Sequence, residues 1–184
     1  KFYMRYSLDM KYGKKTRKII QMIKPQRKFM LAAMKEAQKA KERGDYAIGA
    51  VITKDGKIIA SGGNRVKTKN DSSRHIELEI AQYCKGMIKD RYLEGYVLYS
   101  TAEICFMCLG ACWWVGIRDI FYGVSQKDLS EYGKRYGTSG LRYRSTPISS
   151  KDLIKRYNLP VKMEQFMREE CLKMMESHAR DINK

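Results

Sequence analysis

Two short motifs combine residue types and spacings that could bind a metal ion and move a proton. His75 and Glu77 form an H-x-E motif, and Cys105 and Cys108 form a C-x-x-C motif that begins 30 residues after the histidine. A catalytic zinc site takes three protein ligands and leaves a fourth position for water. One imidazole and two thiolates are a suitable set. The spacing therefore predicts one zinc ion per chain, bound by His75, Cys105 and Cys108.

Glu77 could act beside this metal without binding it. Zinc makes a water far more acidic, so hydroxide is available near neutral pH. A carboxylate two residues past the histidine could take the water's proton, pass it to a ring nitrogen and later protonate leaving ammonia. This division of labour indicates hydrolytic deamination of a nucleobase ring. Either motif alone is weak, because an H-x-E arises by chance and a C-x-x-C could be a redox pair.

The segments that must position these residues alternate between helical and extended patterns. We predict helices over 26–43, 75–88, 105–115, 125–132 and 169–179, and strands over 47–53, 57–61, 96–100 and 118–124. Lys54-Asp55-Gly56 predicts a hairpin turn between the first two strands. We further predict a loop over 133–150, a helical turn over 151–157 and an edge strand over 161–166. This order is typical of a three-layer α/β fold, with a mixed sheet between helices.

Chain length and charge limit the number of domains and the kinds of binding partner that we expect. The 184 residues suit one domain with a hydrophobic core, and the net charge is +17. Residues 1–28 carry ten Lys and Arg side chains against one acid. We therefore predict a basic N-terminal extension over 1–25 and a zinc-dependent deaminase domain over 26–184. The extension could bind RNA phosphates and stack on bases, or it could be a solvated basic tail.

The apolar pattern and the cysteines indicate a compartment. No apolar run has the length needed to cross a bilayer, and the sequence does not open with a signal-peptide pattern. The five cysteines are an odd number, which argues against a disulfide framework. We expect a cytoplasmic protein without a membrane partner, in which Cys105 and Cys108 form a metal or redox site.

The chain resembles the cytidine deaminase superfamily, and within it the branch of guanine deaminases and bacterial tRNA adenosine deaminases. The segments that carry the resemblance are AIGAVITKDGKIIASGGNRV, HIELEIA and LYSTAEICFMCLGACWWVGIRDIFYGV. The resemblance implies a five-stranded mixed sheet flanked by helices and assembly as a dimer or tetramer, of which we expect a homodimer. It also implies zinc on His75, Cys105 and Cys108, with Glu77 as the proton shuttle. The implied substrate-binding residues are Ile48, Ala50, Asn64 and Trp114.

Two positions depart from the family's pattern, and several substrates stay open. Ala47 and Ile104 stand where the family usually has proline. We rank first the deamination of an aminopurine base or nucleoside of the guanine or guanosine type, because Trp114 matches the tryptophan of the guanine deaminase branch. Adenosine-to-inosine deamination of tRNA is the second candidate, and cytosine or cytidine deamination is another. A non-catalytic, zinc-stabilised module that binds nucleic acid ranks last, because Glu77 is present.

Overall fold

The computed structural model describes residues 23–89, 92–136 and 148–182, so nearly all of the predicted extension over 1–25 lies outside the described residues. Five strands form one sheet in the order β2-β1-β3-β4-β5. Strand β1 is antiparallel to β2 and β3, whereas β3, β4 and β5 run parallel, which confirms the predicted mixed sheet. The strands are β1 (Gly49–Lys54), β2 (Lys57–Gly63), β3 (Val97–Ala102), β4 (Asp119–Val124) and β5 (Lys162–Gln165).

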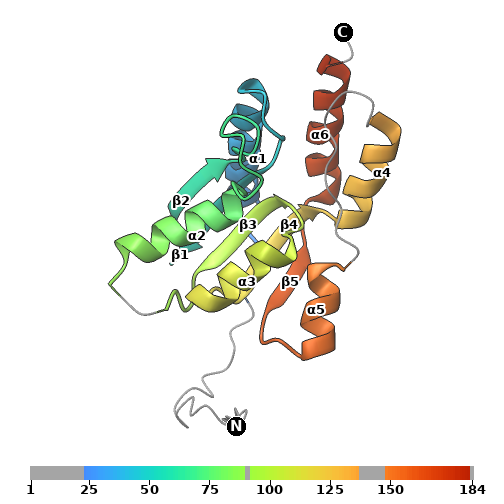
Figure 1. The fold of residues 1–184 in the computed structure, drawn as a ribbon. Helices are drawn as coiled ribbons and strands as arrows, with labels where there is room; N and C mark the ends of the chain where they lie inside the picture. Colours follow the sequence, from blue (N-terminus) through green and yellow to red (C-terminus); the bar gives the residue numbers. More distant parts are fainter. Residues whose placement is uncertain (1–22, 90–91, 137–147, 183–184) are drawn as a thin grey trace, which may run out of the picture.

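Helices cover both faces of this sheet, as Figure 1 shows. One apolar core lies between the sheet and α2, α3 and α5, and a second lies on the opposite face beneath α1, α4 and α6. This arrangement confirms the predicted α/β/α sandwich. None of the helices in the described ranges is long and apolar enough to span a bilayer. The helices are α1 (Arg27–Glu42), α2 (Ile76–Met87), α3 (Phe106–Val115), α4 (Gln126–Tyr136), α5 (Ser150–Tyr157) and α6 (Arg168–Ile182).

Helix α4 is longer than predicted. It continues through Gly133 to Tyr136, although a loop was predicted from residue 133 onward; residues 137–147 of that loop lie outside the described part of the chain. Contacts with α6 explain the difference. The buried Tyr132 hydroxyl donates to the carbonyl of Met175 at 3.1 Å, and Arg135 lies 3.7 Å from Glu176. This packing offsets the roughly 1 kcal/mol by which a glycine disfavours a helix.

The close approach of α1 to β1 requires a glycine at position 49. A Cβ atom there would overlap the backbone of Ala33 and Ala37 on α1. We expect Gly49→Ala to lower the free energy of unfolding by at least about 2 kcal/mol, because backbone cannot move aside as a side chain can. Gly86→Ala is the control: a Cβ on this α2 residue meets nothing within 4 Å, so we expect a gain of about 0.5 kcal/mol. Urea unfolding of both variants measures this; equal effects would contradict the packing argument.

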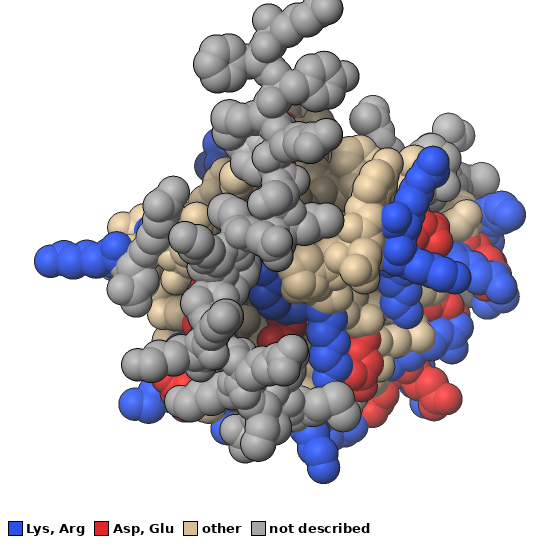
Figure 2. Space-filling view, turned by 90° about the horizontal axis from the view of Figure 1, so that it is seen from below, with Lys and Arg blue, Asp and Glu red and all other residues tan. Residues whose placement is uncertain are grey.

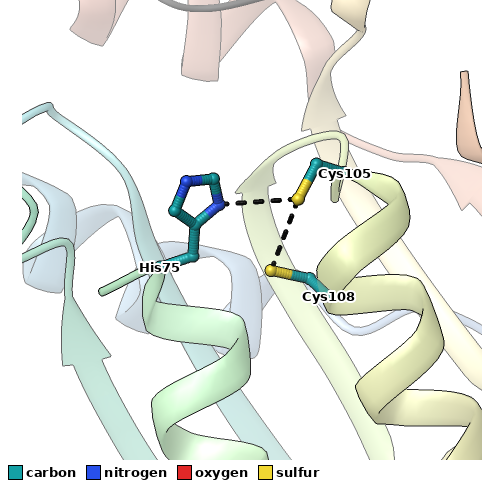
Figure 3. A group of neighbouring side chains, drawn as sticks. All are labelled: His75, Cys105 and Cys108. Atoms are coloured by element: carbon teal, nitrogen blue, oxygen red, sulfur yellow. Dashed lines mark hydrogen bonds between the residues drawn. The ribbon is translucent and has the colours of Figure 1, made fainter. Parts of the chain in front are cut away.

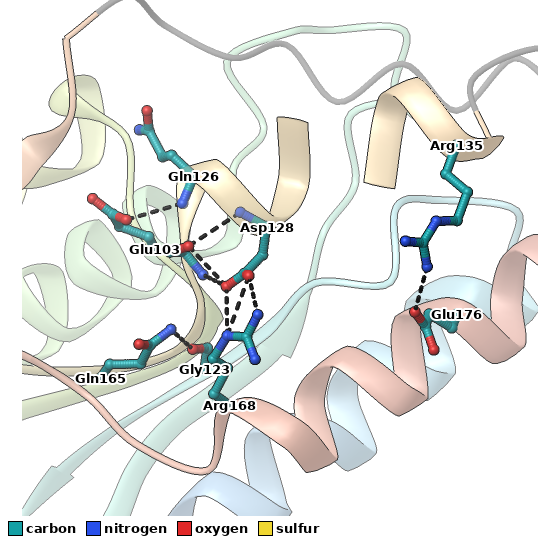
Figure 4. Close-up of polar contacts among 9 residues, drawn as sticks. Glu103, Gly123, Gln126, Asp128, Arg135, Gln165, Arg168 and Glu176 are labelled. Atoms are coloured by element: carbon teal, nitrogen blue, oxygen red, sulfur yellow. Dashed lines mark hydrogen bonds and ion pairs between the residues drawn. The ribbon is translucent and has the colours of Figure 1, made fainter. Parts of the chain in front are cut away.

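An ion pair joins the start of α4 to the start of α6. The Asp128 carboxylate accepts hydrogen bonds from two nitrogens of the Arg168 guanidinium (Figure 4). It also accepts hydrogen bonds from the Ser125 backbone N–H and hydroxyl. Burial alone would raise the pKa of Asp128, but the bonds from Arg168 and Ser125 outweigh it and hold this pKa below its usual value. The charged carboxylate therefore stabilises the fold above pH 4 or so, and that contribution is lost as the pH falls further.

We expect Asp128→Asn to lower the free energy of unfolding by about 1–3 kcal/mol at pH 7, because Arg168 loses its charged partner. The difference from the unmodified chain should shrink as the pH falls below about 4, because the carboxylate of the unfolded chain binds a proton there before the native carboxylate does. Urea unfolding at several pH values tests this. Asp152→Asn is the matched control, since Asp152 caps α5 through Ser149 in the same way but is exposed. An equal loss in both variants would show that capping, and not Arg168, accounts for the effect.

Candidate active site

The topology brings the ends of four strands together at one end of the sheet. Because β1 runs antiparallel to β2 and β3, the start of β1 lies beside the ends of β2 and β3, and the parallel β4 ends there too. Ile48 precedes β1, Asn64 follows β2, Cys105 follows β3 and Gln126 follows β4. Residues far apart in the sequence therefore surround one cavity of about 260 Å³.

The predicted metal ligands meet beside this cavity (Figure 3). The Cys105 sulfur lies 3.6 Å from His75 Nδ1 and 3.7 Å from the Cys108 sulfur, and the three ligand atoms lie within 4.8 Å of one another. A tetrahedral zinc ion with ordinary bond lengths needs about 3.6 Å between sulfur and nitrogen and about 3.8 Å between two sulfurs. The two distances from the Cys105 sulfur match these values, and the cluster as a whole could hold such an ion.

Cys105 and Cys108 lie at the start of a helix, where the thiolate form that binds a cation is favoured. His75 is the N-cap of α2 and Cys105 is the N-cap of α3, as the sequence predicted, so both face the positive ends of helix dipoles. The hydrogen bond shared with Cys108, supported by His75, lowers the pKa of Cys105 to about 4 against the effect of burial. The same hydrogen bond and burial raise the pKa of Cys108, so binding a metal at both sulfurs must displace a proton.

Glu77 lies next to the cluster and is only 3% exposed. Its Oε1 accepts a hydrogen bond from the Ser100 hydroxyl at 2.7 Å, and its Oε2 lies 3.8 Å from the Cys108 sulfur. Burial raises the pKa of Glu77 above its usual value, although the bond from Ser100 opposes this. The carboxylate is thus close to the three ligands without belonging to that group, which is the arrangement a proton shuttle requires.

Two of the predicted substrate-binding residues line the cavity with His75, Glu77 and Cys105. These are Ile48 and Asn64. The side-chain oxygen Oδ1 of Asn64 accepts a hydrogen bond from the Val66 backbone N–H at 3.0 Å. The amide N–H groups are therefore what Asn64 can offer to a bound ring, which suits a ring nitrogen or a carbonyl oxygen.

The other two predicted substrate-binding residues are not among those that line this cavity in the described chain. Ala50 is fully buried within β1, opposite Ser100 of β3. Trp114 is 74% exposed on α3 and packs edge-on against Trp113. Within the described residues, Trp114 is therefore not part of the cavity wall.

A comparison with known families assigns this site. Residues 23–124 match the cytidine and deoxycytidylate deaminase zinc-binding region, which covers more than half of the chain and all three ligands. The chain belongs to the cytidine and deoxycytidylate deaminase family. It is accordingly a zinc-dependent deaminase, and His75, Cys105 and Cys108 are positioned to bind its zinc ion.

Relatives within the deaminase family act on different substrates. The tRNA-specific adenosine deaminase of Agrobacterium fabrum is 37% identical over 120 residues, which cover 65% of this chain and 75% of that protein. The guanine deaminase of Bacillus subtilis is 43% identical over 85 residues, which cover 46% of this chain and 54% of that enzyme. Both enzymes remove an amino group from a purine. Their sequence identities to this chain are similar, so they do not show which of the two purines this chain deaminates.

Solved deaminase structures share the fold. The structure of Bacillus subtilis guanine deaminase is 27% identical, with a TM-score of 0.55 over 73% of this chain and 92% of that one. Guanine deaminase from Nitrosomonas europaea reaches a TM-score of 0.70 over 83% of each chain, at 17% identity, and so shows likeness of fold alone.

Sequence reasoning missed several residues around the deaminase cavity. Ser100 bonds to Glu77, and Glu103 and Gln126 line the cavity, with the Gln126 backbone N–H donating to Glu103 at 2.9 Å. One local signal could have indicated Ser100. Side chains two residues apart on a strand lie on the same face, and Ser100 is two residues before Ala102, which lines the cavity. Gln126 reaches the cavity through the parallel pairing of β3 and β4, which no local pattern reveals.

Proposed function

We propose that this chain hydrolyses the exocyclic amino group of an aminopurine base or nucleoside, of the guanine or guanosine type, and releases ammonia. The observation that carries the proposal is the Glu77 carboxylate beside the His75, Cys105 and Cys108 cluster, at a cavity that Glu77 and Asn64 both line. The cavity of about 260 Å³ is smaller than the roughly 300–1,000 Å³ of sites for drug-sized ligands, which favours a single base.

In this proposal each side chain has one task. Zinc, when bound, supplies a Lewis acid that makes a water nucleophilic near neutral pH. Asn64 donates a hydrogen bond that orients the ring, and Ile48 contributes apolar contact. Glu77 takes a proton from the attacking water, gives it to a ring nitrogen, and carries a second proton to the leaving ammonia. The products are the keto ring and ammonia, so no oxidant or reductant is needed.

A tRNA adenosine deaminase is the second candidate, and two observations favour it. The first is the 37% identity with the Agrobacterium fabrum enzyme. The second is the excess of Lys and Arg in residues 1–28, which could bind the RNA backbone. On the face in Figure 2, by contrast, the described Lys and Arg side chains are interspersed with Asp and Glu. A basic extension over 1–25 would then hold the RNA backbone while the adenosine enters the cavity of the 26–184 domain.

We further propose that the chain works as a homodimer in the cytoplasm. Large apolar side chains are exposed on α3 and α5, where they support self-association: Phe106 is 51%, Trp114 is 74% and Tyr157 is 64% exposed. Sedimentation of the full chain at several concentrations tests this. A monomer at every concentration would contradict it.

Ammonia release from a substrate panel tests the proposed reaction. The panel contains guanine, guanosine, adenosine, cytosine, cytidine and an adenosine-bearing tRNA, each with the zinc-loaded chain. We expect release from guanine or guanosine. Inosine formed only in tRNA would favour the second candidate, and replacing Lys14, Lys15, Arg17 and Lys18 by Gln should then weaken RNA binding and flatten its salt dependence. Activity only on cytosine or cytidine, or on nothing, would overturn the proposal.

A further inference from the structure

We propose that Ser100 is a positioning residue for Glu77, holding one carboxylate oxygen so that the other faces the metal cluster and the bound ring. The inference rests on the proposed function, since it assigns a task to Ser100 within that reaction. Ser100 lies on β3 and belongs neither to the ligand set nor to the cavity lining.

The contacts of Ser100 give it a single orientation. Its hydroxyl donates to Glu77 Oε1 at 2.7 Å and accepts from the Ala102 backbone N–H at 3.4 Å. A serine hydroxyl has one proton to donate, so the bond to Glu77 uses it. Ser100 is fully buried and Glu77 is 3% exposed, so bulk water does not replace this bond.

The two oxygens of Glu77 are thereby given different surroundings. Oε1 is held by β3, whereas Oε2 lies 3.8 Å from the Cys108 sulfur. Glu77 comes from the first turn of α2, and its long side chain would otherwise sample several rotamers. Because a shift of about 1 Å at a reacting group can cost about 100-fold in rate, a fixed carboxylate matters more for turnover than for binding the ring.

Four variants separate a positioning role from simple support of the fold. Ser100→Ala removes the hydroxyl. Ser100→Thr retains it, and Ser100→Val has the shape of threonine without it. Thr53→Val is the control, because Thr53 is also a buried strand residue whose hydroxyl donates to a backbone carbonyl, that of Val97, outside the cavity lining.

For Ser100→Ala and Ser100→Val we expect kcat to fall about 10- to 100-fold while KM stays within about threefold, with zinc content still one per chain. Ser100→Thr should recover most of the lost kcat, and Thr53→Val should keep the kcat of the unmodified chain. An unchanged kcat in Ser100→Ala, or equal losses in the Thr and Val variants, would overturn the inference.

Failure of the proposed function would look different from failure of this inference. If the unmodified chain releases no ammonia from any purine, the reaction itself is wrong. If the unmodified chain is active and loses activity when Glu77 is replaced, but kcat does not change when the Ser100 hydroxyl is removed, only the positioning role is wrong.

Discussion

We expect Glu77→Gln to lower kcat by about 1,000-fold or more while the chain still binds one zinc ion. An amide cannot accept and return a proton, and general acid–base catalysis contributes about 10²- to 10⁴-fold on its own. Glutamine keeps the size of the side chain, and its carbonyl oxygen can still accept from Ser100. The change therefore removes the proton transfer with little change in packing. Ammonia release from guanine or guanosine, with zinc measured on the same sample, checks the prediction.

Glu79→Gln is the matched control for this variant. Glu79 lies two residues further along α2, is only partly exposed, and pairs with the exposed Arg74 at 3.4 Å, outside the lining of the cavity. We expect its kcat to stay within about twofold, since surface ion pairs contribute little. Full activity of Glu77→Gln, or the same loss in both variants, would show that the Glu77 carboxylate does not carry the proton.

The second large effect is expected for Cys108→Ser, which should bind less than about 0.1 zinc per chain and lose measurable deamination. A hydroxyl is a poor ligand at neutral pH, and two remaining ligands hold a zinc ion far less tightly than three. We also expect a lower melting temperature, because the ion links the start of α2 to the start of α3. Elemental analysis of protein purified without chelators measures the metal.

Cys112→Ser separates metal binding from the general cost of changing a buried thiol. Cys112 lies one turn beyond Cys108 on α3 and is also fully buried, and burial raises its pKa to about 12, so it is a neutral thiol. We expect this variant to keep one zinc ion per chain and its activity. If Cys112→Ser also loses the ion, or Cys108→Ser keeps it, the ligand set is wrong.

Most of the fold followed from local patterns because these patterns have direct physical causes. Asp55 and Gly56 adopt positive φ angles of 48° and 76°, which is what a tight hairpin with an Asp-Gly turn requires. The four-residue strand β5 lies at the edge of the sheet, as predicted for 161–166. Helix α4 was cut short in the prediction because the Gly-, Ser- and Arg-rich segment over 133–150 indicates a loop locally, whereas the contact of Tyr132 with α6 is long-range.

In the candidate site, too, local patterns predicted some residues, whereas others depend on long-range contacts. His75 and Cys105 could be placed at helix starts because the helical patterns begin beside them, and the C-x-x-C spacing sets both sulfurs on one turn. The sequence did not indicate that Trp114 would be exposed on α3 and outside the set of residues that line the cavity, so its contact with substrate stays a prediction. The bond between Ser100 and Glu77 depends on how α2 packs on the sheet, which no single segment encodes.

X-ray absorption at the zinc edge of the purified full chain tests the central claim most directly. The account predicts one zinc ion per chain with two sulfur neighbours at about 2.3 Å and two nitrogen or oxygen neighbours at about 2.0–2.1 Å, one of them an imidazole. Four sulfur neighbours, no sulfur neighbours, or a protein that binds no zinc would contradict a catalytic ion held by His75, Cys105 and Cys108.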